Sequence, residues 1–540
     1  MVTWRAWVQV SAIGLALLVA TRLPAQSPSQ TPHYKVSTHL VQFGVIARNK
    51  EGVSGNLTKN DFVILDRGKP RTISVFEADA VGHTPLAAAL PPNTFSDEPR
   101  YNGEAPRTVT IILLDNLNTL SGSGLQPFGE APMWVEDHAL GMAKEHLLTF
   151  LGQMDPRDRV AIYGLTDQVR VLCDFTCNRD QLLAAVRAYD VRSHTAQDSV
   201  DPPNIRLPNV PPEFNEAIDQ DMRSLAEMHT EDRAALTMAA LTSITAHVAD
   251  LPVRKNLLWL TADLPVSGAA IAAVLARGNI VAYPIDARGL LPKTGAIDIA
   301  DANPFKNGNV AVELGHAAVP MGQGAMTDMA ADTGGRAFLN TNNLTDAIRQ
   351  VVENSAATYT LGFYLPEKEV DGKFHRITVK TKMPGITLTY PRGYFAIGDA
   401  AVSENDRRNA FLAAIRSPLD ATAVPVDVRL ARAEQPPHSL QIVGVAGIGD
   451  VFFQQQDDLR TGALEIYAIQ QDAAGNVLNQ MNQRLDLKLN EQQYEQYLRS
   501  GILFRNLVTL KSGATVLRVL VQDPHSAEVG CVIVPLDSVN

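Results

Sequence analysis

The stretch Arg107–Thr119, "RTVTIILLDNLNT", decides the fold class of this 540-residue chain. Its run "TVTIILL" consists almost entirely of β-branched and aliphatic residues, which is typical of a strand buried on both faces. Such strands belong to parallel sheets that are covered by helices on both sides. The run stops at Asp115, and Asn116, Asn118 and Thr119 follow within the next four positions. The stretch therefore predicts a buried strand that carries a carboxylate at its carboxyl end.

The sequence around this strand continues the same pattern over residues 105–355. Further apolar runs, "RVAIYGLT", "NLLWLTAD" and "IVAYPIDARG", predict strands, and the amphipathic segments between them predict helices. Alternating strands and helices imply a mainly parallel, Rossmann-like sheet. "RVAIYGLT" and "VRVLCDFT" are separated only by Asp167 and Gln168, which predicts a hairpin. We expect one α/β domain here, with its functional loops at the carboxyl ends of the strands.

The segments on either side of this domain predict β structure. Residues 34–79 alternate apolar and polar positions and predict a small antiparallel unit. Residues 356–398 form a β extension that directly follows the last helix, so we expect it to pair with the N-terminal unit. Residues 403–540 begin with a short helix and predict a β-sandwich-like domain. Residues 80–106, rich in Pro, Ala and Asn, predict a linker or strap. The expected fold is thus multidomain, α/β plus β.

The N-terminus, residues 1–25, predicts an export signal. Arg5 precedes the apolar stretch Ala6–Ala20, and "RLPAQ" offers small-residue cleavage after Ala25. The apolar stretch, about 15 residues long, is short for a bilayer core, which needs roughly 20 residues. We expect an exported protein, periplasmic or secreted, with no transmembrane span in the mature chain.

The charge of the chain argues against nucleic acid as a partner. Its net charge is −11, from 47 basic and 58 acidic residues, and no long basic run occurs. Binding to a phosphate backbone requires clustered Lys and Arg. We therefore expect no contact with nucleic acid.

Two of the three cysteines, Cys173 and Cys177, lie close together in "CDFTC". In an extended chain their Cα atoms would be about 13 Å apart, whereas a disulfide requires less than about 7 Å. A bridge therefore needs a tight turn directly after Cys173. A disulfide and two separate thiols both remain open, and Cys531 has no evident mate.

Two carboxylates are candidates for a metal site, because each directly follows a buried strand. Asp115 follows "TIILL" and Asp263 follows "NLLWLTA", so both are expected at one crevice of the sheet. Oxygen ligands there suit a hard divalent ion such as Mg²⁺ or Mn²⁺. In the alternative interpretation, Asp115 accepts hydrogen bonds from backbone amides at the strand end. Asp286 is a third strand-end carboxylate, for which a salt bridge with Arg288 is the favoured interpretation.

The sequence lacks the common catalytic motifs. It contains no His-Glu-x-x-His, no phosphate loop and no Gly-x-Ser-x-Gly elbow. His138 and His146 lie eight positions apart on a predicted helix and lack the spacing of a zinc pair. We expect no catalytic residue, no organic cofactor and no enzymatic activity.

Taken together, the motifs resemble a von Willebrand factor type A domain, and more closely the VWFA-related proteins of the Acidobacteria. The resemblance covers residues 34–396. It is carried by the phrases "LTKNDFVILDRGKPRTISVFE", "TIILLDNLNT", "MDPRDRVAIYGLTDQVRVLCDFTCNRDQLLAAV", "RKNLLWLTADLP", "IVAYPIDARG", "MAADTGGRAF", "YTLGFYLPE" and "GKFHRITVKTKMPG". It implies an exported protein with a Rossmann-like sheet and a binding role, and it names no substrate.

The resemblance also implies a degenerate metal site. In von Willebrand A domains a metal ion-dependent adhesion site begins Asp-x-Ser-x-Ser. The family's positions map onto Asp115, Leu117, Thr119, Asp263 and, for an intervening threonine, Thr195 or Thr166. Asp115 and Thr119 carry side-chain oxygens, but Leu117 does not. The implied metal ligands are therefore Asp115, Thr119 and Asp263.

Three functions fit these observations. The favoured one is binding of a partner protein in the envelope or outside the cell, with a metal bridging Asp115 and a carboxylate of the partner. A metal-dependent envelope hydrolase is an alternative, disfavoured because no nucleophile–base pair is visible in the sequence. A structural protein with a non-functional metal site is the third.

Overall fold

The computed structural model describes most of the chain from Thr38 onward, which forms one compact unit. The described residues are 38–50, 52–53, 57–78, 90–97, 108–119, 138–154, 158–189, 212–249, 251, 254–288, 322–341, 343–354, 358–396, 403–456, 458–526 and 528–539. The predicted export signal, residues 1–25, lies outside them. Within these ranges, no helix combines the length and apolar character that crossing a membrane requires.

The strand predicted from the opening stretch lies in the middle of a five-stranded sheet. In spatial order the strands are β11 (Ile280–Asp286), β10 (Arg254–Thr261), β7 (Thr108–Asp115), β8 (Arg159–Leu165) and β9 (Val169–Cys173). β7 pairs in parallel with β10 and β8, and β8 and β9 form the predicted antiparallel hairpin. The prediction of a mainly parallel α/β sheet is confirmed.

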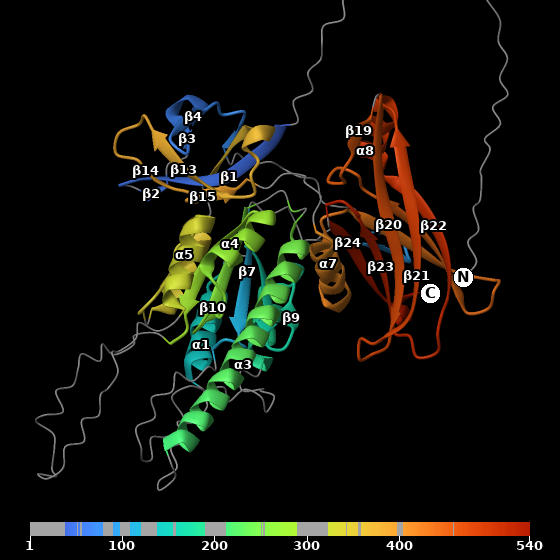
Figure 1. Ribbon diagram of the computed structural model, residues 1–540, viewed down its shortest axis with the longest axis horizontal. Helices are drawn as coiled ribbons and strands as arrows, with labels where there is room; N and C mark the ends of the chain where they lie inside the picture. The colour runs from blue at the N-terminus through green and yellow to red at the C-terminus, as the bar shows by residue number, and fades with distance from the viewer. Residues whose placement is uncertain are drawn as a thin grey trace, which may run out of the picture. The chain divides into compact units, whose positions relative to one another are not determined.

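Helices cover both faces of this sheet, which explains why β7 is apolar throughout. One face carries α1 (His138–Gly152), α2 (Arg179–Ala188) and α6 (Leu344–Asn354), and the other carries α3 (Pro212–His247), α4 (Gly268–Arg277) and α5 (Gln323–Thr333). Alternate side chains of β7 enter the two cores. Ile112 and Leu114 join the first cluster, whereas Ile111 and Leu113 join the second. In Figure 1, α3 and α4 run across the face of β7 and β10.

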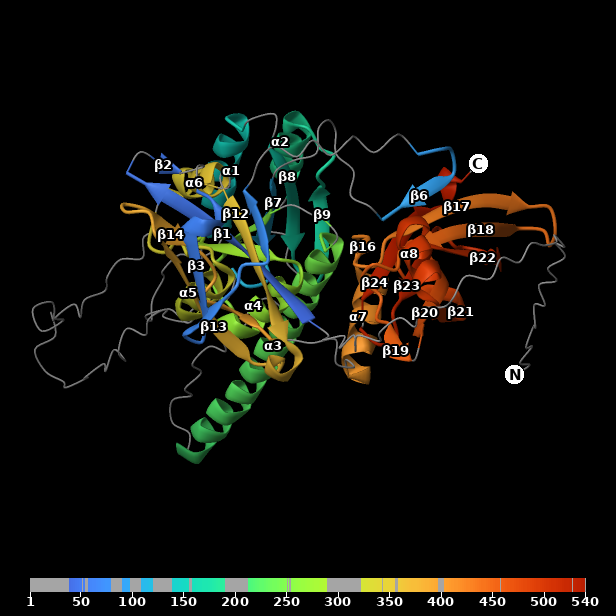
Figure 2. The same cartoon turned by 90° about the horizontal axis from the view of Figure 1, so that it is seen from above.

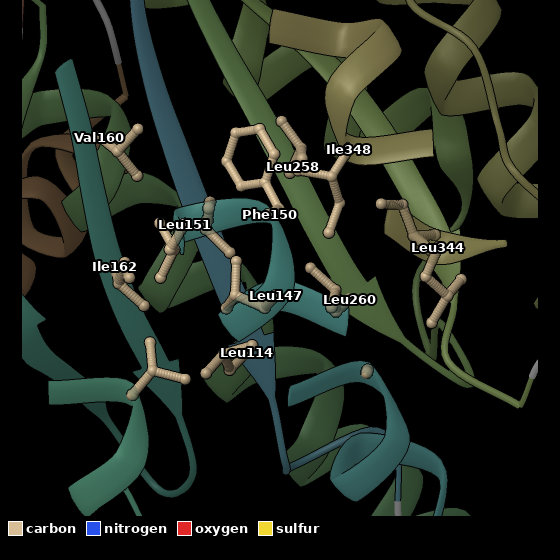
Figure 3. Packing of buried hydrophobic residues seen from close by; sticks show 14 of the residues in the cluster. Leu114, Leu147, Phe150, Leu151, Val160, Ile162, Leu258, Leu260, Leu344 and Ile348 are labelled. Atoms are coloured by element: carbon tan, nitrogen blue, oxygen red, sulfur yellow. The ribbon is translucent and has the colours of Figure 1, made fainter. Parts of the chain in front are cut away.

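The packing of α1 shows how this sheet is held. Leu147 and Leu151 of α1 lie against the side chains of β7 and β8, and Ile348 of α6 packs beside β10 (Figure 3). All three are fully buried. Burying one such side chain contributes about 1.5–3 kcal/mol. The central sheet is therefore a rigid support for whatever lies at its edges.

A smaller β unit is built from segments on both sides of the α/β domain in the sequence. Its first sheet contains β14 (Thr387–Thr389), β1 (Thr38–Asn49), β12 (Thr358–Pro366) and β5 (Val75–Ala78), with β2 (Gly52–Val53) pairing β1. Its second sheet contains β15 (Gly393–Phe395), β13 (Phe374–Thr381), β3 (Phe62–Asp66) and β4 (Lys69–Arg71). β1 pairs β12 and β3 pairs β13, both antiparallel. The expected pairing of the two segments is confirmed.

The C-terminal part contains two sheets and two helices. α7 (Glu404–Arg416) comes first, as predicted, and α8 (Glu491–Ser500) lies between strands. One sheet contains β16 (Ala421–Thr422), β24 (Val529–Pro535), β23 (Val516–Gln522), β20 (Leu459–Gln471) and β19 (Gln454–Gln456), with β21 (Val477–Leu489) pairing β20. The other contains β22 (Ile502–Thr509), β18 (Ser439–Ala446), β17 (Val426–Ala433) and β6 (Thr94–Ser96). Both sheets contribute to one hydrophobic cluster.

The strand β6 was not foreseen, because it lies in the segment predicted to be a linker or strap. It pairs antiparallel with β17, more than 300 residues away in the sequence (Figure 2). Phe95 packs against the C-terminal cluster, and the carboxylate of Asp97 accepts a hydrogen bond of 2.8 Å from the Val426 amide. Three residues are too few to show a strand periodicity, so no sequence pattern predicts this strand.

Candidate functional site

The chain turns sharply where β7 ends. Asp115, the last residue of β7, is fully buried. The amides of Asn116 and Leu117 both donate to the carbonyl of Leu165 at the end of β8, over 2.9 and 3.1 Å. The polar residues after the strand therefore stay against the sheet edge.

The Asp115 carboxylate is surrounded by N–H donors. Its Oδ1 accepts from the Asn118 amide at 3.0 Å, and its Oδ2 accepts from Asn118 Nδ2 at 2.9 Å and from Trp259 Nε1 at 2.8 Å. Thr119 Oγ1 donates to the backbone carbonyl of Asp115. Burial raises the pKa of Asp115, and the hydrogen bonds from Asn118 and Trp259 offset this only in part. The geometry matches the alternative in which Asp115 accepts hydrogen bonds at the strand end.

Several partners of this turn were missed by sequence reasoning. Asn118 Nδ2 also lies 2.9 Å from the Thr237 hydroxyl on α3, and the Tyr189 hydroxyl donates to Asn116 Oδ1 over 3.1 Å. Trp259 comes from the middle of β10. One signal was present in the sequence: a tryptophan inside a fully buried strand needs an acceptor for its indole N–H, and Asp115 was an available carboxylate.

Asp263 lies just beyond β10, beside the Asp115 turn. Its Oδ2 is 3.7 Å from Arg233 Nη2, and its backbone carbonyl accepts from the Thr261 hydroxyl at 2.8 Å. The Thr261 side chain also lowers the pKa of Asp115. Burial raises the pKa of Asp263, partly offset by the Leu264 amide and by Arg233. Asp263 Oδ1 is buried and accepts no hydrogen bond from the described residues.

The third strand-end carboxylate, Asp286, is neutralised within the fold. It is fully buried, and Arg288 donates to it from Nε at 2.8 Å and from Nη2 at 2.9 Å. The Arg288 backbone amide donates to it as well, over 3.1 Å, and Gln323 Nε2 adds a fourth hydrogen bond of 2.8 Å. The predicted salt bridge between Asp286 and Arg288 is confirmed.

Two of the three predicted metal ligands, Asp115 and Thr119, are engaged by protein groups and, as they are arranged, do not fit a divalent ion. The N–H groups that point at Asp115 occupy the lone pairs that an ion would need. Thr119 directs its hydroxyl to a backbone carbonyl, and Leu117 packs with an apolar cluster. Over the described ranges, no group of three or more His, Cys, Asp or Glu side chains is placed to hold a metal ion. Thr195 lies outside those ranges. A metal at this edge stays a prediction for titration.

A second polar cluster adjoins the hairpin. Cys173 and Cys177 form a disulfide, with Cα atoms 6.0 Å apart, which decides between the two interpretations of "CDFTC". The enclosed Asp174 accepts hydrogen bonds through Oδ1 from the Tyr163 hydroxyl at 3.0 Å and from the Phe175 amide at 2.8 Å. The disulfide thus closes a short loop that presents a carboxylate.

The Asp174 loop reaches the end of α3. Asp174 Oδ2 lies 3.3 Å from His247 Nε2, within ion-pair distance but without hydrogen-bond alignment. His247 Nδ1 lies 2.9 Å from the carbonyl of Asp420. Burial lowers the pKa of His247, but Asp174 and Asp420 outweigh it, and the net shift is upward. Burial raises the pKa of Asp420 to about 6.

Comparison with known proteins gives matches among solved structures. No protein-family model and no curated protein matches the chain. An aerotolerance-related membrane protein from Bacteroides fragilis is 13% identical, with a TM-score of 0.26, over 46% of this chain and 98% of that one. A von Willebrand factor type A protein from Catenulispora acidiphila is 11% identical, with a TM-score of 0.26, over 58% and 71%.

A further match is proximal thread matrix protein 1 from the mussel byssus, in a structure described as having a zinc-occupied MIDAS motif. It is 10% identical, with a TM-score of 0.24, over 48% of each chain. The chain is similar to these three proteins at low sequence identity and low TM-score. What each of them binds is therefore stated of that protein alone.

Proposed function

We propose that this chain is an exported protein-interaction module, and that the carboxyl edge of its central sheet contacts a partner protein. The observation that supports this is the internal saturation of Asp115 and Asp286 by protein donors. These buried carboxylates hold the loops of the edge in place, which preorganises them for a contact. They are poor general bases, because a general base must be available to take a proton. The proposal includes the resemblance to VWFA-related proteins of the Acidobacteria type.

The described edge offers polar groups for such a contact. Asp167 and Gln168, in the turn between β8 and β9, are exposed. Asp263, Arg233 and Arg288 add partly exposed charges of both signs. Mixed charge of this kind favours specificity and association rate in a protein contact. The N-terminal β unit and the two C-terminal sheets, which we interpret as a β-sandwich, would act as spacers or as further contact surfaces.

The proposal is tested with two variants. One adds a positive charge at the carboxyl edge of the central sheet, and the control adds the same charge away from that edge. Gln168→Arg alters the exposed turn at the carboxyl end of β8. Thr149→Arg alters an exposed position in the last turn of α1, which leads into β8 from the opposite edge. A partner would first be captured from envelope extract, identified by mass spectrometry and purified. Binding would then be measured by calorimetry.

We expect Gln168→Arg to weaken this binding by about tenfold or more, equivalent to about 1.4 kcal/mol. Thr149→Arg is expected to leave it unchanged. Equal affinity for both variants and wild type would place the contact elsewhere and overturn the assignment of this edge.

A further inference from the structure

A cavity of about 90 Å³, partly open to solvent, lies beside the end of α3. Its walls are completed by helices α4 and α7, by residues from the segment 417–423, and by Ser526, Glu528 and Val529. Much of the lining is alanine, including Ala246 from α3 and Ala410 and Ala414 from α7. Side chains of this size leave a space that larger residues would fill, and several Ser and Thr residues make part of its wall polar.

Two opposite charges line the same cavity without bonding to each other. Glu528 is contributed by the segment before β24, and Arg277 by the last turn of α4. Among the described residues, neither the Glu528 carboxylate nor the Arg277 guanidinium takes part in a hydrogen bond or an ion pair. Their charges nevertheless act on each other, since Arg277 lowers the pKa of Glu528. The two residues therefore line one cavity but do not form an ion pair with each other.

Burial of the Glu528 carboxylate without a partner is energetically unfavourable. The residue as a whole is half-buried, but burial raises the pKa of its carboxyl to about 7, and the carboxylates of Asp450 and Asp523 add to this. A buried carboxylate that lacks a partner loses solvation that nothing replaces. A cationic group placed beside it would recover that loss.

We propose that this cavity binds a small zwitterion of the α-amino acid type. Its ammonium group would contact Glu528, its carboxylate would contact Arg277, and a short apolar side chain would lie against the alanines. A simple cation is disfavoured by Arg277, and a simple anion is disfavoured by Glu528. A molecule that carries both charges satisfies both side chains, and arginine binds carboxylates in a forked, bidentate geometry.

The volume limits the size of the side chain. A cavity of about 150 Å³ accommodates the six non-hydrogen atoms of benzene, so a cavity of 90 Å³ encloses about four non-hydrogen atoms of a ligand. Glycine and alanine are slightly larger than this, so part of either molecule must lie at the side of the cavity that is open to solvent. Phenylalanine is far larger.

The experiment titrates the full chain with alanine as the probe, by calorimetry and by thermal unfolding. Methylamine, acetate and phenylalanine test the single charges and the size limit. We expect alanine to bind saturably and to raise the melting temperature, because a ligand that binds only the folded state stabilises it. The three comparison molecules are expected to bind at least about tenfold more weakly.

Matched variants assign the contacts. Glu528→Gln and Arg277→Gln each remove one charge, and each is expected to weaken alanine binding by about tenfold or more. Glu495→Gln and Arg499→Gln, at exposed positions of α8, are expected to leave it unchanged. Because Glu528 must be ionised to hold the ammonium group, wild-type affinity should fall as the pH drops below about 7. The Glu528→Gln variant should lack this pH dependence, which distinguishes a lost contact from a misfolded variant.

Three results would overturn the proposal. One is the absence of saturable heat at alanine concentrations of up to about 10 mM, which is the weakest dissociation constant that would count as binding. Another is binding that Glu528→Gln leaves intact. The third is phenylalanine binding as tightly as alanine.

Discussion

For a single residue such as Asp115, the neighbouring donors decide the role. The same two carboxylate oxygens can hold a cation or accept N–H groups, and the choice depends on what surrounds them. Here Asn118 and Trp259 supply three N–H donors. Leu117 adds no oxygen. Asp115 therefore has the contacts of a structural hydrogen-bond acceptor.

This assignment predicts the response to metal ions. We expect no heat when Mg²⁺ or Mn²⁺ is titrated into the protein, and no change in melting temperature with EDTA, because the Asp115 lone pairs are occupied. Leu117→Ser adds a hydroxyl but removes none of the N–H donors, so we expect no heat of metal binding from this variant either. A saturable heat in wild type that disappears in Asp115→Ala would restore the metal site.

A second prediction concerns the stability that Asp115 provides. Asp115→Asn keeps the shape of the side chain but turns an NH₂ group toward N–H donors, whichever way the amide is oriented. Leaving a buried donor without its acceptor costs about 1–3 kcal/mol of the free energy of unfolding. Asp167→Asn, at an exposed position, should change it by less than about 0.5 kcal/mol. Urea denaturation measures both, and equal values would show that the Asp115 contacts contribute nothing.

Among the secondary-structure elements, the loop from β9 to α2 combines a disulfide with a helix cap. Cys173 and Cys177 close the loop, and Asn178 then begins α2 by accepting a hydrogen bond from the Gln181 amide. The loop is thereby fixed at both ends. Asp174 is held where it can meet His247 of α3.

Breaking this loop should lower stability measurably. The double variant Cys173→Ala/Cys177→Ala removes a closed loop of five residues, for which the chain-entropy model gives a loss of about 2 kcal/mol in the free energy of unfolding. Reduction of the wild type should produce a similar loss. Reductant should not affect the double variant, which serves as the control. Unchanged stability after complete reduction would contradict the prediction.

The short strand β6 gives a test at the same scale. Asp97→Ala leaves the buried Val426 amide without its acceptor, so we expect a loss of about 1–3 kcal/mol in the free energy of unfolding. Asp427→Ala, at the neighbouring exposed position of β17, is the matched control. Equal losses would mean that the contact of β6 with β17 is not specifically stabilised by Asp97.

The compact unit as a whole contains buried titratable groups where the end of α3 meets the segment before β16. His247 contacts Asp174 and the carbonyl of Asp420, while Arg518 and the Tyr163 hydroxyl are nearby charged or polar groups. The pKa of His247 is raised, so its contribution to stability is complete below about 6.5 and is lost as the pH rises through the folded-state value.

The pKa values of the two neighbouring carboxyls, Asp420 and Asp174, are shifted in opposite directions. Burial raises the pKa of Asp420 to about 6, so its contribution is present at acid pH and is lost as the pH rises through that value. Burial acts to raise the pKa of Asp174, but His247 outweighs it and the net shift is downward. The contribution of Asp174 is therefore present above its ordinary value near 3.8 and is lost at lower pH.

The directions of these pKa shifts predict how the folding stability of the protein depends on pH. We expect the melting temperature to fall between pH 3.8 and about 6, where Asp420 ionises in the unfolded chain before it does so in the folded one. It should fall again as the pH rises above about 6.5, where His247 loses its proton. His247→Gln should reduce this slope. His146→Gln, which removes an imidazole that contacts Thr345 instead, should retain it. Identical slopes in thermal unfolding for both variants would show that His247 does not cause the effect.

The sequence by itself determined the features that depend on near neighbours. The apolar run of β7, the hairpin around Asp167 and Gln168, and the bridge from Asp286 to Arg288 were all predicted and are confirmed. Each involves residues a few positions apart, or a periodicity that hydrophobic burial imposes on one segment. Such signals are complete within a short window of sequence.

Tertiary structure alone decided the contacts that give the site its chemistry. Trp259 donates to Asp115 across 144 positions, and Asp97 accepts from Val426 across 329. The disulfide was open in the sequence, because it depends on how tightly the chain turns after Cys173. A hydrogen-bond donor that arrives from a distant strand leaves no mark on the residues around its acceptor. The sequence could therefore place Asp115 at the strand end, whereas only the packing of β10 against β7 showed that its oxygens are already engaged.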